Sequence, residues 1–183
     1  MKKTTMPDQR SKRFVFVPFC MICQASQAQG IVKLGFTSVI TPVLNEVLSH
    51  NVNMIQMPCP ESRLGGYKKG LKRLPKSFEA YNTPEFLAVC EDTAKEAVEM
   101  MEGIVGNGYE VSLVLGIEFS PSCSVDLQYS NKGAFHQAGH FIAILQKKML
   151  EVGIEAPFVG INRRGVKSSI KKINNILSKK MFS

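Results

Sequence analysis

The sequence lacks the long apolar runs and the nucleotide-binding motifs that identify many protein classes at once. No apolar stretch is long enough to cross a lipid bilayer, and the run FVFVPF behind the basic start is too short for a signal peptide. There is no Walker loop, GxGxxG, Ser-His-Asp pattern or catalytic lysine motif, so a dinucleotide- or ATP-dependent enzyme has no support. With 44% apolar residues and no low-complexity stretch, the 183 residues predict one globular domain.

Histidine is also scarce, because the chain contains only His50, His136 and His140. The last two have the i, i+4 spacing of a helical zinc pair, but no HExxH motif is present and Gly139 lies between them. We therefore expect surface or capping roles for both.

The chain alternates strand and helix patterns from end to end. Apolar runs predict buried strands at 14–19, 51–58, 109–119 and 156–162, and helical spacing predicts helices at 38–50, 83–108, 136–152 and 166–182. Ser38 and Thr83 are the expected N-caps of the first two helices. This alternation predicts a Rossmann-like α/β fold, with a parallel sheet of about four strands and helices on both faces.

The net charge of +8 is concentrated at the two ends of the chain. Residues 1–14 carry +4, residues 165–183 carry +5, and residues 15–164 sum to −1. We read 1–12 as a disordered basic leader and 13–183 as a single domain that ends in a basic amphipathic helix. Nucleic-acid binding through the tails is possible but not expected, and no membrane partner is predicted.

Residues 63–76 form the one basic stretch inside the domain, with six cations and no acid. Such a run is either a solvated loop or a surface that attracts an anionic substrate such as a nucleotide. The predicted phosphate contacts are Lys68, Lys69, Lys72 and Arg73.

Three of the five cysteines follow predicted strands. Cys20 ends FVFVPFC, Cys59 ends MIQMPCP, and Cys123 follows VSLVLGIEFSPSC. Because the carboxyl ends of parallel strands meet along one edge of a sheet, we expect these thiols to converge. Three thiolates hold a metal or a cluster while leaving one coordination position open, which suits catalysis. An odd number of cysteines and no signal peptide predict a reducing, cytoplasmic location.

The remaining cysteines have simpler readings. Cys23 completes a CxxC with Cys20, typical of a dithiol redox centre, but the segment that follows is a poor helix and contains Gly30. Cys90 lies within the longest predicted helix and is expected to be a small buried apolar side chain.

Polar residues whose side chains can take part in catalysis flank two of the strand-end cysteines. Glu61 comes two residues after Cys59, where a carboxylate either moves protons or caps a turn. In SPSC, the hydroxyl of Ser120 either faces the site or belongs to an ordinary turn.

The order strand–Cys-x-x, strand–CPE followed by GG, and strand–SPSC resembles the 2-thiouracil desulfidase family over residues 14–162. The stretches QMPCPESRLGG and TPEFLAVC resemble an uncharacterised branch of desulfidases. The chain departs from the usual family pattern in CMIC, in Ser124 after SPSC and in GGYKKGLKRLPK.

The resemblance implies an enzyme with a [4Fe–4S] cluster held by Cys20, Cys59 and Cys123. The fourth iron would take sulfur from a thiolated base such as a thiouracil or its nucleotide, in a hydrolytic desulfidation. Glu61 and Ser120 would line the substrate site, together with Gln56.

The residues alone leave two other classes of function open. A zinc hydrolase could use the same three cysteines, although PCPES supplies one cysteine where zinc deaminases need a PCxxC pair. A non-catalytic metal or cluster sensor that touches nucleic acid through basic tails is the second alternative.

Overall fold

A four-stranded parallel sheet forms the centre of the protein in a computed structural model that describes residues 10–32, 41–130 and 132–179. Its strands are β1 (Arg13–Pro18), β2 (Asn53–Met57), β3 (Glu110–Ile117) and β6 (Phe158–Ile161). They are ordered β2-β1-β3-β6, with every neighbouring pair parallel. The predicted single-domain α/β fold is therefore confirmed.

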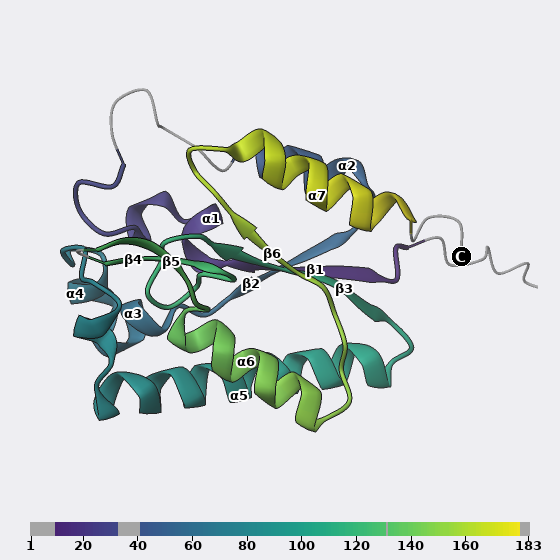
Figure 1. Cartoon of the computed structure of the whole chain (residues 1–183). Helices are drawn as coiled ribbons and strands as arrows, with labels where there is room; N and C mark the ends of the chain where they lie inside the picture. Colours follow the sequence, from purple (N-terminus) through teal and green to yellow (C-terminus); the bar gives the residue numbers. More distant parts are fainter. Residues whose placement is uncertain (1–9, 33–40, 131, 180–183) are drawn as a thin grey trace, which may run out of the picture.

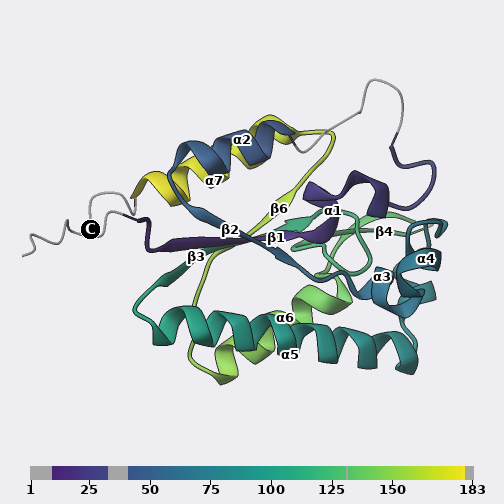
Figure 2. The same cartoon turned by 180° about the vertical axis from the view of Figure 1, so that it is seen from behind.

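Four helices cover the two faces of the sheet. Helices α2 (Thr41–Ser49) and α7 (Val166–Lys179) lie on one face, and α5 (Pro84–Gly106) and α6 (His140–Glu151) lie on the other, as Figures 1 and 2 show from opposite sides. Strand β1 alternates between the two cores, because Val15 and Val17 pack on the α2–α7 side while Phe16 packs on the α5–α6 side.

The carboxyl edge of the sheet carries most of the short elements. These are α1 (Phe19–Ile22), η1 (Gln24–Ser26), α3 (Pro60–Leu64), α4 (Gly66–Gly70), η2 (Glu79–Tyr81) and the antiparallel hairpin β4 (Leu127–Ser130) and β5 (Gly133–His136). In Figure 1 they gather at the end of the sheet away from the C-terminus. This edge is where ligand crevices form in open α/β sheets.

The longest helix follows its predicted boundaries closely. The Thr83 hydroxyl accepts a hydrogen bond from the Phe86 amide at 3.2 Å, Pro84 is the first helical residue, and the helix ends at Gly106. The Ser38 cap lies outside the described residues, as do residues 1–9 of the predicted leader.

The main difference from the sequence prediction lies before α6. The helix expected from residue 136 begins at His140, because residues 127–130 and 133–136 form the two strands of the β4–β5 hairpin instead. Strand β1 likewise ends at Pro18, and Phe19 begins α1. The hairpin strands are too short to show a clear alternating pattern in the sequence.

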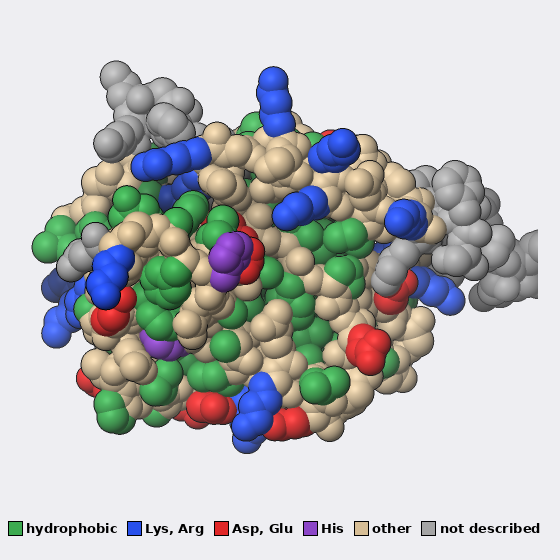
Figure 3. All heavy atoms as spheres, in the orientation of Figure 1, with side chains coloured by type: hydrophobic (Ala, Val, Ile, Leu, Met, Phe, Trp, Pro, Cys, Tyr) green, Lys and Arg blue, Asp and Glu red, His purple; other side chains and the backbone are tan. Residues whose placement is uncertain are grey.

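Helix α7 is amphipathic in the structure, with Ile173 and Leu177 buried and its described lysines exposed. Figure 3 shows Lys and Arg side chains gathered along the side of the molecule that α7 covers. Among the described residues, no helix combines the length and apolar character needed to cross a bilayer.

Candidate functional site

A pocket of about 630 Å³ opens at the carboxyl edge of the sheet, and all three strand-end cysteines line it. Cys20 lies in α1 directly beyond β1, Cys59 is the N-terminal cap of α3 beyond β2, and Cys123 lies in the loop after β3. Cys59 and Cys123 are buried, while Cys20 is partly exposed. The parallel topology thus brings together three thiols that are far apart in the sequence.

The three thiols influence one another electrostatically. Burial, together with the nearby Cys59, raises the pKa of Cys20 to about 12. Burial also raises the pKa of Cys123 well above its usual range, with added contributions from Cys59 and Cys20. The buried site therefore favours the neutral thiols unless a positive charge offsets the thiolates.

The three cysteines supply thiol donors, which are ligands of both zinc and iron–sulfur clusters. Within the described ranges, no three His, Cys, Asp or Glu side chains surround one ion position. A zinc ion needs every sulfur at about 2.3 Å from the same centre. In an iron–sulfur cluster each cysteine binds a different iron, so the sulfurs stand further apart, and soft thiolates are its usual ligands.

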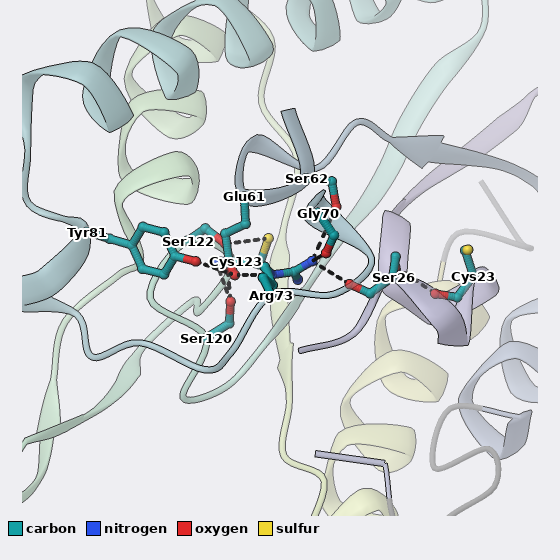
Figure 4. Close-up of polar contacts among 10 residues, drawn as sticks. All are labelled: Cys23, Ser26, Glu61, Ser62, Gly70, Arg73, Tyr81, Ser120, Ser122 and Cys123. Carbon is teal, nitrogen blue, oxygen red and sulfur yellow. Dashed lines mark hydrogen bonds and ion pairs between the residues drawn. The ribbon is translucent and has the colours of Figure 1, made fainter. Parts of the chain in front are cut away.

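Glu61 lies at the centre of a hydrogen-bonded group in the same pocket (Figure 4). One carboxylate oxygen accepts the Ser122 hydroxyl at 2.5 Å, and the other accepts the Arg73 Nε at 3.0 Å and the Tyr81 hydroxyl at 3.3 Å. Burial and the Glu61 carboxylate raise the pKa of Tyr81, so the phenol stays protonated and donates. The carboxylate is oriented by three side chains and still lines the cavity.

Arg73 was predicted to contact a substrate phosphate, but its guanidinium is already engaged within the protein. Besides the ion pair with Glu61, one terminal nitrogen donates to the carbonyls of Ser26 at 2.6 Å and Gly70 at 2.7 Å. Burial lowers the pKa of Arg73, but Glu61 and Cys59 outweigh this effect and the net shift is upward. Arg73 therefore holds Glu61 in place as a permanent cation.

Hydrogen bonds among its own residues hold the SPSC turn in place. The Ser120 hydroxyl accepts the backbone N–H of Cys123 at 3.1 Å, and it lies 3.3 Å from the Ser122 hydroxyl. The Ser122 hydroxyl in turn contacts the Cys123 sulfur at 3.4 Å. Ser120 lines the pocket, while the serine that donates to Glu61 is Ser122, which sequence reasoning did not single out.

Two glycines make room for the Cys123 loop. A Cβ atom on Gly116 would overlap the Cys123 carbonyl oxygen, and one on Gly139 would overlap the Ser122 carbonyl. Any side chain at these positions would push the third thiol away from the other two. The signal in the sequence was a glycine inside the apolar run of β3, which marks a close backbone approach.

Several predicted substrate residues do not reach the pocket. The Gln56 amide donates to the Phe19 carbonyl at 2.7 Å and so positions α1, rather than lining the cavity. Lys68, Lys69 and Lys72 are exposed on and after α4, and none of them lines the cavity. The three lysines among the predicted phosphate contacts thus belong to the outer surface of this stretch, whereas Arg73 lines the cavity.

Other cations line the pocket in their place. Arg163 and Arg164 follow β6 at the same sheet edge, and Lys76 ends the basic stretch. The Arg163 Nε is buried and has no hydrogen-bond partner among the described atoms, and its charge lowers the pKa of the Cys20 thiol. Sequence analysis did not single out Arg163 or Arg164, although the run NRR directly after a predicted strand was an available signal.

The remaining cysteines and histidines lie elsewhere. Cys23 does not line the pocket, and in Figure 4 it stands apart from the Glu61 group, linked to it through Ser26. Cys90 is fully buried in the core. His136 is in β5 and pairs with Asp126, whereas His140 begins α6, so the two do not form a helical pair.

The fold and the pocket together define an α/β protein with a thiol-lined site at the carboxyl edge of a parallel sheet. No family model matches the chain. It is 26% identical over 124 residues to an uncharacterised protein of Methanocaldococcus jannaschii, a match that covers 68% of this chain and 73% of that protein.

Two solved structures are distantly similar in fold. One is a [4Fe-4S]-dependent thiouracil desulfidase, TudS, with a TM-score of 0.45 and 17% identity over 90% of this chain and 99% of that chain. The other is an FMN-dependent NADH-azoreductase from Bacillus anthracis in complex with FMN, with a TM-score of 0.33 and 11% identity over 92% of this chain and 98% of that chain. Because these two enzymes differ in cofactor and reaction, a likeness at this level identifies no activity.

Proposed function

We propose that this protein is an iron–sulfur-dependent desulfidase that removes sulfur from a thiolated heterocycle, such as a thiouracil-type base or its nucleotide. The observation that carries the proposal is the pocket itself. Cys20, Cys59 and Cys123 line one cavity together with Glu61, a carboxylate held in a fixed orientation. The CPE and SPSC motifs that supply these residues are also those that resemble the 2-thiouracil desulfidases.

The three cysteines would hold a [4Fe–4S] cluster through their thiolates. Such a cluster would supply Lewis-acidic iron with an affinity for the soft sulfur of a C=S group. Arg163, whose buried Nε has no partner in the described structure, would offset part of the negative charge that three thiolates bring.

The proposed reaction replaces sulfur by oxygen without net oxidation or reduction. Water adds to the carbon of the C=S bond, and the sulfur leaves as hydrosulfide. Glu61 would accept the proton from this water, because its carboxylate lines the cavity and is held by Arg73, Tyr81 and Ser122. Ser120 would hold an edge of the ring through its hydroxyl.

A nucleotide substrate would meet the cations that line the pocket. Arg163, Arg164 and Lys76 take this role in place of the exposed Lys68 and Lys69. Affinity for a thiolated nucleotide should then fall with added salt, because part of it is electrostatic.

The direct test is sulfide release from 2-thiouracil and related compounds by anaerobically reconstituted protein. We expect stoichiometric formation of sulfide and the oxygenated base. A protein with an intact cluster that is inactive across a panel of thiolated bases and nucleotides would refute the desulfidase and favour a sensor. Activity with zinc in the absence of iron would favour the zinc hydrolase.

A further inference from the structure

One residue of the pocket wall has a backbone conformation that its side chain disfavours. Phe119 has φ 65°, in the left-handed region, where a bulky aromatic residue is a genuine outlier. Apart from glycines, only Asn51 shares a positive φ within the described residues, and asparagine tolerates that region well. Strain of this kind persists when surrounding contacts enforce it, and it is concentrated at functional sites.

The contacts that enforce this conformation come from both sides of the residue. The Phe119 amide donates to the Leu127 carbonyl at 2.7 Å, and the next amide, of Ser120, donates to the Ile117 carbonyl at 3.1 Å. The preceding residue, Glu118, is buried and anchors the same turn to the start of β4. The turn is thus held rigidly, and it presents the ring of Phe119 at a fixed position.

That ring contributes little to the core. Phe119 is 37% exposed and Tyr129, its aromatic neighbour, is 62% exposed, and neither residue belongs to the two hydrophobic cores that flank the sheet. The two centroids are 6.3 Å apart in an edge-to-face arrangement, and both residues line the cavity that contains the cysteines. A strained, exposed aromatic residue at a cavity is better explained by ligand contact than by stability.

We propose that Phe119 and Tyr129 form an aromatic wall against which the planar ring of the substrate stacks, so that the pocket selects flat, aromatic heterocycles. The identity of the ring as a thiolated pyrimidine rests on the proposed function, whereas stacking itself does not. Stacking of a base on an aromatic side chain contributes strongly to binding and tolerates many ring types.

The test compares the binding of uracil and 5,6-dihydrouracil to reconstituted protein by calorimetry. The two compounds carry the same hydrogen-bonding groups, but only uracil is planar and aromatic, and neither contains sulfur to be removed. We expect the wild-type protein to prefer uracil by roughly 5-fold or more. Phe119→Gly and Tyr129→Ala should each abolish this preference.

Thermal unfolding separates a stacking residue from a packing residue. Phe119→Gly should raise Tm by roughly 2–4 °C, because glycine relieves the left-handed strain. Phe119→Leu should lose the uracil preference without this gain in Tm. Asn51→Gly is the matched control, since it changes the other positive-φ residue, and it should leave uracil binding unchanged.

Three outcomes would refute the proposal that a substrate ring stacks on the aromatic wall. They are equal binding of uracil and dihydrouracil by the wild type, an unchanged preference in Phe119→Gly, and a Tm that falls in Phe119→Gly. Absence of sulfide release together with a ring preference that depends on Phe119 would refute the desulfidase and leave the wall standing. Sulfide release together with a ring preference that does not depend on Phe119 would refute the wall and leave the desulfidase standing.

Discussion

Two glutamates line the same pocket, and they are held in opposite ways. Among the described residues, Glu61 accepts hydrogen bonds from side chains alone, which come from three separate parts of the chain: Arg73, Tyr81 and Ser122. Glu118 accepts from its own neighbourhood, through the backbone amides of Asp126 and Leu127 at 3.2 and 2.8 Å and the Ser124 hydroxyl at 2.7 Å.

The difference indicates different tasks. Backbone donors within a few residues fix the shape of a turn, so Glu118 supports the loop that carries the third cysteine. Gly160 accommodates this carboxylate, because a Cβ there would overlap it. Side-chain donors from distant segments instead orient the carboxylate of Glu61 toward a cavity. We therefore expect Glu61 to matter for chemistry and Glu118 for stability.

The largest expected effect is that of Glu61→Gln on turnover. Gln keeps the size of the side chain but cannot accept a proton from water, so kcat for sulfide release should fall by about 10²–10⁴-fold. Iron and sulfide content should remain at the wild-type level. Wild-type turnover in this variant would remove Glu61 from the mechanism and leave desulfidation itself standing.

Glu118→Ala should act on stability. It removes the one carboxylate oxygen that accepts all three hydrogen bonds, and we expect a loss of about 1–3 kcal/mol in the free energy of unfolding. Urea denaturation followed by circular dichroism measures this loss. A Glu118 variant as stable as the wild type would show that the hydrogen-bond partners of the two glutamates do not determine their roles.

The serines beside the glutamates provide a matched and smaller pair of changes. Ser122→Ala removes a donor to Glu61 and should lower kcat by roughly 10-fold with little change in Tm. Ser124→Ala removes a donor to Glu118 and should cost about 1 kcal/mol of stability, with the chemical step intact. A loss of stability in Ser122→Ala together with a loss of turnover in Ser124→Ala would contradict the roles assigned to Glu61 and Glu118.

Much of the architecture follows from local patterns in the sequence. The apolar runs of β1 and β3, the Thr83 cap and the alternation of elements depend on neighbouring residues, and each is visible without the structure. The position of the cysteines after strands was enough to place them at one edge, because parallel strands share their direction.

The partners within the site were not predictable in the same way. The basic stretch shows six cations, but nothing in their spacing indicates that Arg73 turns inward while Lys68 and Lys69 stay exposed. The Ser122–Glu61 contact joins residues 61 positions apart, a distance over which local pattern carries no information. The β4–β5 hairpin was missed because its strands have four residues each.

The central claim is that three cysteines, and only those three, hold one cluster, and cysteine replacement after anaerobic reconstitution tests it most directly. Iron and sulfide analysis with EPR after reduction should show a [4Fe–4S] centre in the wild type, and its loss in Cys20→Ala, Cys59→Ala and Cys123→Ala. Cys23→Ala and Cys90→Ala should retain it, because neither thiol lines the pocket. A full cluster in any of the first three variants, or its loss in Cys90→Ala with the fold intact, would contradict the account.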